Sequence, residues 1–174
     1  MRILVTYFEP FDNRKENISE QIVTKLSEEL EVDIIKIPVS YRRAFQVIED
    51  KIKDYDYVVL TGEAVSRSEL TVEYLAVNLA HSKTSDNDNI IYQNEKIGSD
   101  DAYISNTNVI KLVEETKTKI SMSAGTFVCN YLYYQTLKYI KTNNLQTKSV
   151  FIHFPGINLE KAEESFVRII KYLQ

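Results

Sequence analysis

Apolar β-rich runs alternate with amphipathic helical runs in the first third of the chain, and this order constrains the fold more than any other feature. The β-rich runs are residues 2–7, 32–37 and 57–61. Apolar residues at helical spacing occupy residues 18–30, which Asn17 can cap, and residues 40–52. Short connections between such runs are typical of parallel strands joined by right-handed crossovers. We therefore predict an α/β fold, a three-layer α/β/α arrangement around a mostly parallel twisted sheet.

The remainder of the chain continues the alternation around one long polar segment. Residues 81–98 lack a convincing period, and we predict a mobile excursion or loose hairpin there. The expected strands are residues 70–80, 120–123 and 149–154, and the expected helices are residues 106–117, 128–142 and 159–173. Because no repeat or linker interrupts the sequence, residues 1–174 are predicted to form a single domain.

Composition excludes several classes of function. With 44% hydrophobic and 26% charged residues, the chain falls in the soluble globular class, and no apolar run approaches the roughly 20 residues of a membrane span. The N-terminal run lacks the features of a signal peptide, so we expect a cytoplasmic location. A net charge of -4 argues against a nucleic-acid partner. One cysteine excludes an internal disulfide, and without zinc-type spacing of Cys and His we expect no structural or catalytic metal.

The only cysteine, Cys129, lies in the first turn of the predicted helix 128–142, just after a turn at Gly125. Unpaired N–H groups at a helix N-terminus carry partial positive charge, which lowers a thiol pKa from about 8.5 and can hold an oxyanion. We therefore interpret Cys129 as a nucleophile. The alternative is a small buried hydrophobic residue, the role of most free cysteines.

A histidine and an acid within reach of Cys129 would favour the nucleophile. His153 lies near the C-terminal end of the predicted strand 149–154, at the edge of a parallel sheet where active sites commonly form. Its alternative is a hydrogen-bonded core histidine, whereas His81 is expected to be solvated. Glu73 shares a face of the predicted strand 70–80 with apolar residues, so its carboxylate needs a partner or an exposed edge position.

Around these three residues, four short motifs in the same order resemble the pyrrolidone-carboxylate peptidases (pyroglutamyl peptidase I), and the match is collinear over most of the chain. The motifs are TYFEPF at 6–11, GEAVSR at 62–67 with EYLAVN at 73–78, SAGTFVCN at 123–130, and FIHFP at 151–155. The chain resembles a divergent and short member of that family. The resemblance implies a phosphorylase/hydrolase-like sheet and a cysteine exopeptidase that removes an N-terminal pyroglutamyl residue.

The resemblance also implies a role for each site residue. Cys129 would be the nucleophile, His153 the base and then the acid, and Glu73 the group that orients the imidazole. The implied substrate-binding residues are Phe8, Phe11, Glu63, Lys83, Phe127 and Val128. The substrate would be a small peptide with a blocked N-terminus, cleaved through a thioester without metal or cofactor. A homo-oligomer is a further expectation.

Several positions depart from the family pattern, among them Tyr7, Asp12, Asn13 and Ser66. Lys83 replaces an arginine, and Glu63 stands where glutamine is frequent. An ionised carboxylate has no donor for a lactam carbonyl, so we expect weak activity on standard pyroglutamyl substrates. The alternatives are the same triad acting on another small N-acyl amide, or a non-hydrolytic binding protein. The intact triad favours the enzymes.

Overall fold

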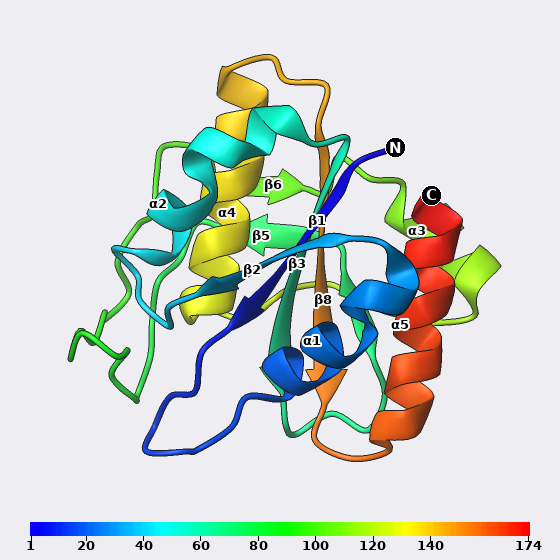
Figure 1. The fold of residues 1–174 in the computed structure, drawn as a ribbon. Coiled ribbons are helices and arrows are strands. Elements are labelled where there is room, and N and C mark those ends of the chain that lie inside the picture. The colour runs from blue at the N-terminus through cyan, green and yellow to red at the C-terminus, as the bar shows by residue number, and fades with distance from the viewer.

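A six-stranded sheet with the order β2-β1-β3-β8-β4-β7 crosses the centre of the molecule (Figure 1). The computed structural model describes residues 1–174. Four parallel strands form most of the sheet: β1 (Ile3–Phe8), β2 (Asp33–Ile37), β3 (Tyr57–Ala64) and β8 (Lys148–Pro155). At one edge, β4 (Thr71–Glu73) runs antiparallel to β8 and pairs in parallel with β7 (Lys119–Ser121). The predicted α/β fold with a mostly parallel sheet is confirmed.

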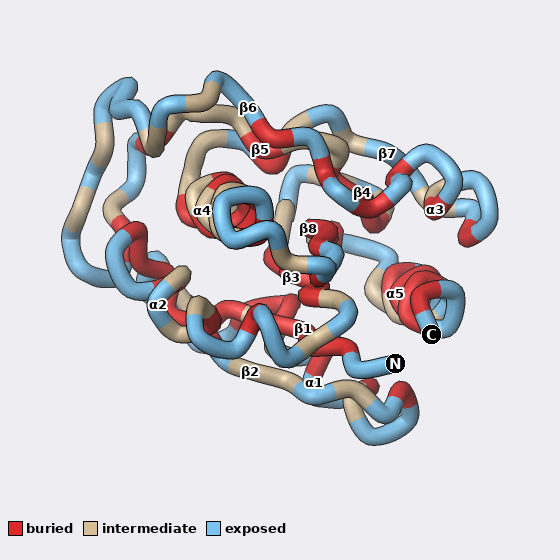
Figure 2. Tube along the Cα trace, turned by 90° about the horizontal axis from the view of Figure 1, so that it is seen from above, coloured by how far each residue is buried: buried red, intermediate tan, exposed pale blue.

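Helices cover both faces of this sheet, which makes three layers (Figures 1 and 2). One face carries α1 (Ile18–Leu30), α3 (Val109–Thr116) and α5 (Leu159–Leu173). The other carries α2 (Ala44–Ile48), the 3-10 helix η1 (Glu49–Asp54) and α4 (Val128–Thr142). Figure 2 shows buried residues along β1, β3 and β8 and on the inner sides of α4 and α5. Each face therefore has its own apolar core, with the sheet between them.

Local signals explain why the best predicted helices form. The Asn17 side chain accepts the Ser19 N–H at 3.0 Å and so caps α1. The helices α4 and α5 begin and end at the predicted residues, because each carries a continuous apolar stripe. The predicted helix 40–52 is instead the short α2 followed by η1, and β3 continues three residues beyond the expected end at Thr61.

The predicted long strand 70–80 is wrong, because the chain leaves the main sheet at Tyr74. Its N–H donates to the Ser121 carbonyl at 2.7 Å, while its own carbonyl accepts from the Ser105 N–H at 2.9 Å. The following residues form β5 (Leu75–Val77), which pairs with β6 (Ala102–Ile104), a strand that the sequence analysis missed. The Asn130 side chain holds β5 against α4 by bonds of 2.9 Å to the Val77 N–H and carbonyl.

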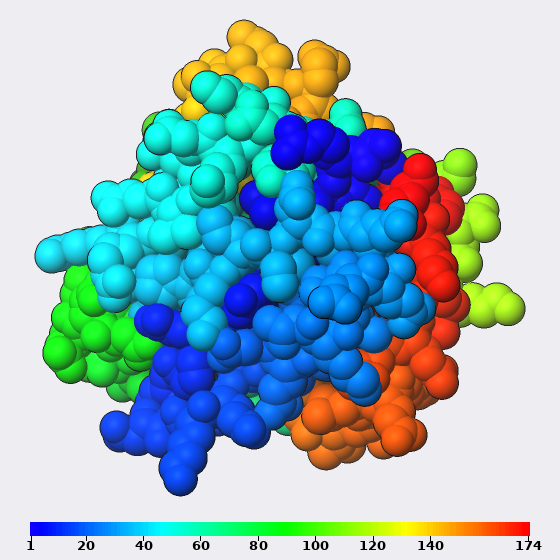
Figure 3. All heavy atoms as spheres, in the orientation of Figure 1, coloured from blue at the N-terminus to red at the C-terminus, as the bar shows by residue number.

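The polar segment 81–98 contains no helix or named strand, only a bridge from Ala80 to Glu95. Figure 3 shows part of this region in green at the margin of the face formed by α1, α2 and β2. None of the helices combines the length and the apolar character needed to cross a bilayer.

Candidate active site

Glu73 and His153 form a buried pair on two adjacent strands. His153 lies opposite Thr71 in the antiparallel register of β8 and β4, so Glu73, the last residue of β4, is its diagonal neighbour. The His153 Nδ1 and Glu73 Oε1 atoms are 2.7 Å apart, and both side chains are buried. The sequence left two alternatives for Glu73, an exposed edge position or a bonded partner. The structure shows the second, because the carboxylate is buried and contacts the imidazole.

The Glu73 carboxylate is held in its ionised form. Burial alone would raise its pKa, but hydrogen bonding and charge from His153, with help from Ser121 and Arg67, lower the pKa below its usual value. The Arg67 guanidinium donates to Glu73 Oε1 and to the Thr71 hydroxyl. An ionised carboxylate at Nδ1 accepts a hydrogen bond from the Nδ1–H group, which leaves Nε2 of a neutral imidazole free to accept a proton.

The thiol of Cys129 lies directly over β3, beside the strand that carries His153. A Cβ atom on Gly62 would lie 2.9 Å from Cys129 Sγ, so only a glycine leaves room for the sulfur there. Gly62 is the register partner of His153 in the parallel pairing of β3 and β8. The first turn of α4, the end of β8 and the end of β4 thus bring Cys129, His153 and Glu73 together beside Gly62 of β3.

The expected lowering of the Cys129 pKa is wrong for the resting protein. Burial raises the pKa of the thiol to about 12, and the negative charges of Glu73 and Glu63 act in the same direction. Arg67 and the backbone N–H of Cys129 lower it only in part. Desolvation therefore outweighs the helix N-terminus, and the resting sulfur is a neutral thiol.

A small apolar cavity of about 50 Å³ opens next to the thiol. Its walls include five of the six residues expected to bind substrate, namely Phe8, Phe11, Glu63, Phe127 and Val128. The sixth, Lys83, is exposed and is not among the lining residues. Asn17 and Val39 also line the cavity and were missed, although Val39 follows β2 at the strand end where loops converge.

Glu63 lines the cavity, but its carboxylate already has partners within the protein. The Arg14 guanidinium bonds both of its oxygens, and Oε2 also accepts the Ile18 N–H at 2.9 Å. These groups satisfy the carboxylate within the protein, but the carboxylate itself still has no donor for a lactam carbonyl, so weak activity on standard pyroglutamyl substrates stays a prediction. His81, which was expected to be solvated, is instead half-buried, and its backbone N–H donates to the Thr126 carbonyl at 3.0 Å.

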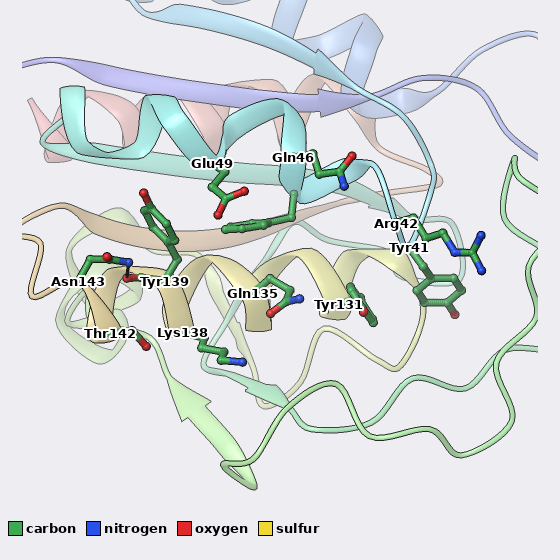
Figure 4. A pocket seen from close by; sticks show the side chains of 11 residues that line it. Tyr41, Arg42, Gln46, Glu49, Tyr131, Gln135, Lys138, Tyr139, Thr142 and Asn143 are labelled. Atoms are coloured by element: carbon green, nitrogen blue, oxygen red, sulfur yellow. Dashed lines mark hydrogen bonds between the residues drawn. The ribbon is translucent and has the colours of Figure 1, made fainter.

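A larger hollow of about 540 Å³ lies between α4 and the segment formed by α2 and η1 (Figure 4). Tyr41 and Tyr131 line one end of it and Asn143 the other, and none of the triad residues lines it. The Tyr41 ring packs edge-on against Phe127, at a centroid distance of 5.5 Å. Of the three residues expected to react, Cys129 lines the smaller cavity. No group of three or more His, Cys, Asp or Glu side chains is placed to hold a metal ion.

Comparisons with known proteins point to one family. A family model described as pyroglutamyl peptidase matches residues 1–166. A pyrrolidone-carboxylate peptidase of Brachyspira hyodysenteriae is 34% identical in an alignment of 169 positions that covers 90% of this chain and 84% of that protein. One from Thermosipho africanus is 37% identical in an alignment of 167 positions that covers 89% of this chain and 82% of that protein.

Solved structures give the same result for the fold. The crystal structure of Bacillus amyloliquefaciens pyroglutamyl peptidase I superposes with a TM-score of 0.89 at 25% identity, covering 97% of this chain and 94% of the other. Pyrrolidone carboxyl peptidase from Thermococcus litoralis superposes with a TM-score of 0.87 at 27% identity, covering 98% and 91%. The similarity thus spans nearly the whole of each molecule.

Proposed function

The chain belongs to the pyroglutamyl peptidase family, whose members are cysteine peptidases, and on this premise we propose that Cys129, His153 and Glu73 hydrolyse the amide after an N-terminal pyroglutamyl residue. The observation that carries the assignment is the buried His153–Glu73 contact of 2.7 Å beside a thiol that lies over Gly62. A core histidine and an inert cysteine would not need this juxtaposition.

Acylation is the first half of the reaction. Because the resting thiol is neutral, His153 Nε2 removes its proton as Sγ attacks the pyroglutamyl carbonyl carbon. Glu73 holds the other ring nitrogen and stabilises the positive imidazolium that results. His153 then transfers the proton to the departing amine nitrogen, the C–N bond breaks, and a thioester to Cys129 remains.

Deacylation uses His153 in the same order, first as a base and then as an acid. His153 takes a proton from water as the water oxygen attacks the thioester carbon. The C–S bond then breaks, Cys129 recovers its proton, and free pyroglutamate leaves. In both halves the negative oxygen of the tetrahedral intermediate faces the start of α4, which has no side-chain cap. Its first N–H groups have no intrahelical partner and therefore serve as donors to that oxygen.

The small cavity supplies the walls for the ring of the substrate. Phe11 and Phe127 stand with their centroids 6.0 Å apart, and with Phe8 and Val128 they form an apolar site next to Sγ. A flat lactam buries its methylene groups against such walls. Because the free space is only about 50 Å³, we expect the aromatic walls to move apart when substrate enters.

The test is a substrate panel with purified protein. We expect hydrolysis of a pyroglutamyl aminocoumarin amide and no comparable turnover of the prolyl, alanyl and N-acetylalanyl amides. Turnover of an N-acetyl amide at a higher kcat/KM than the pyroglutamyl amide would replace this function with the cleavage of another N-acyl group. Absence of any turnover would favour a binding protein. The cytoplasmic location and the homo-oligomer stay predictions.

A further inference from the structure

Arg14 connects two walls of the substrate cavity. It lies on the segment between β1 and α1, where its N–H donates to the Phe11 carbonyl at 3.1 Å and its guanidinium carbon is 5.9 Å from the centroid of the Phe11 ring. The same guanidinium bonds both oxygens of Glu63 on β3. Phe11 and Glu63 both line the cavity. Arg14 thus fixes an aromatic wall to a charged one.

The turn that carries Arg14 is shaped for this contact. Asp12 and Asn13, between Phe11 and Arg14, have φ values of 54° and 59°. Aspartate and asparagine are the non-glycine residues that adopt this left-handed conformation most readily. The turn therefore folds back toward β3, where the Arg14 side chain, 39% exposed, reaches a Glu63 side chain that is only 4% exposed.

The charge of Glu63 matters because the nucleophile lines the same cavity. The Glu63 carboxylate accepts hydrogen bonds from the Arg14 guanidinium and from the N–H of Ile18, the first residue of α1. An anion beside Cys129 disfavours the thiolate. The titratable and charged groups that face the thiol come from every element around it: Glu63, Arg67, Glu73, His153 and Tyr41.

We propose that Arg14 is a positioning residue for the reaction: by pairing with Glu63 it offsets part of the negative charge in the cavity wall, so that Cys129 releases its proton more readily and an uncharged lactam ring can bind. The effect on the ring rests on the proposed function, whereas the effect on the thiol does not. Without Arg14, a largely uncompensated negative charge would face both the thiol and the substrate.

A double-mutant cycle that removes each charge tests the proposal with Arg14→Gln, Glu63→Gln and the double variant. The first measurement is the rate at which iodoacetamide alkylates Cys129, the only cysteine, between pH 7 and 10. We expect Arg14→Gln to slow alkylation about tenfold at each pH, which corresponds to one unit of thiol pKa. In the Glu63→Gln background the same substitution should have no effect. Arg14→Lys, which keeps the charge, should restore most of the rate.

The direction in which the alkylation rate changes distinguishes an effect of charge on the thiol from an effect of easier access to it. A loop that merely opens would let iodoacetamide in faster, so alkylation of Arg14→Gln at or above the wild-type rate would overturn the proposal. An equal slowing in the Glu63→Gln background would also overturn it. Arg43→Gln is the matched control, because Arg43 makes a similar two-bond contact with Asp88 and does not line the cavity. Its alkylation rate should equal that of the wild type.

The second measurement is kcat/KM on the pyroglutamyl amide, and it distinguishes this inference from the proposed function. We expect Arg14→Gln to lose about tenfold, again only when Glu63 is present. If the wild type does not turn over this substrate but the alkylation cycle behaves as expected, the proposed function fails and the charge role of Arg14 stands. If the wild type is active and the cycle shows no coupling, the inference about Arg14 fails alone.

Discussion

Adding one methyl group at Gly62 should displace the nucleophile. The Cβ of Gly62→Ala would lie 2.9 Å from Cys129 Sγ and 3.2 Å from the ring of Phe151. Ordinary contacts of this kind begin at about 3.5 Å. The new methyl group cannot shift toward Phe151, because that ring is fully buried, so the sulfur must move away by about 0.6 Å or more. A shift of about 1 Å at a reacting atom can cost about 100-fold in rate. We therefore expect kcat/KM to fall about 100-fold, roughly 2.7 kcal/mol in the activation barrier.

Overpacking also lowers stability, so the assay needs a control for that effect. Gly98→Ala provides it, because its Cβ would lie 2.8 Å from the Tyr134 hydroxyl, outside the cavity of the triad. Both variants should lose about 1 to 3 kcal/mol in urea unfolding, but only Gly62→Ala should lose activity below its unfolding transition. A folded Gly62→Ala protein with kcat/KM within threefold of the wild type would refute the placement of Sγ over β3.

Two further predictions concern the charges around the thiol. Glu73→Gln should lower kcat about a thousandfold with little change in KM, because an amide can orient the His153 ring but cannot stabilise its positive charge; an unchanged kcat would make Glu73 a structural residue. The alkylation rate of wild-type Cys129 should rise about tenfold per pH unit from pH 7 to 10, because the reactive thiolate stays a minor form below a pKa of about 12. A plateau from pH 6 upward would instead reveal a preformed thiolate–imidazolium pair.

The order of elements could be predicted because it depends on local patterns. The capped helix at Asn17 and the apolar stripes of α4 and α5 are visible in the sequence, and the structure places these helices where the patterns indicate. The break at Tyr74 could not be predicted in the same way. Residues 70–80 alternate like one strand, and only bonds to Ser121 and Ser105, distant in sequence, divide it into β4 and β5.

In the candidate site, too, the features set by nearby residues could be predicted and those set by distant residues could not. Cys129 and His153 could be singled out because a lone cysteine near a glycine turn and a histidine at a strand end are local features. The pKa of the thiol could not be predicted, because it is set by burial and by carboxylates that other strands bring close. Nor could the partner of Glu63, because the sequence does not show that the turn at Asp12 directs Arg14 to β3.

The central claim is that Cys129 is the nucleophile, and the most direct measurement is kcat/KM for Cys129→Ser on the pyroglutamyl amide. A serine hydroxyl beside His153 is a far weaker nucleophile than a thiolate, so we expect activity to fall to the background rate while the protein keeps the circular dichroism spectrum of the wild type. Turnover by Cys129→Ser at a substantial fraction of the wild-type rate would place the nucleophile elsewhere and contradict the account.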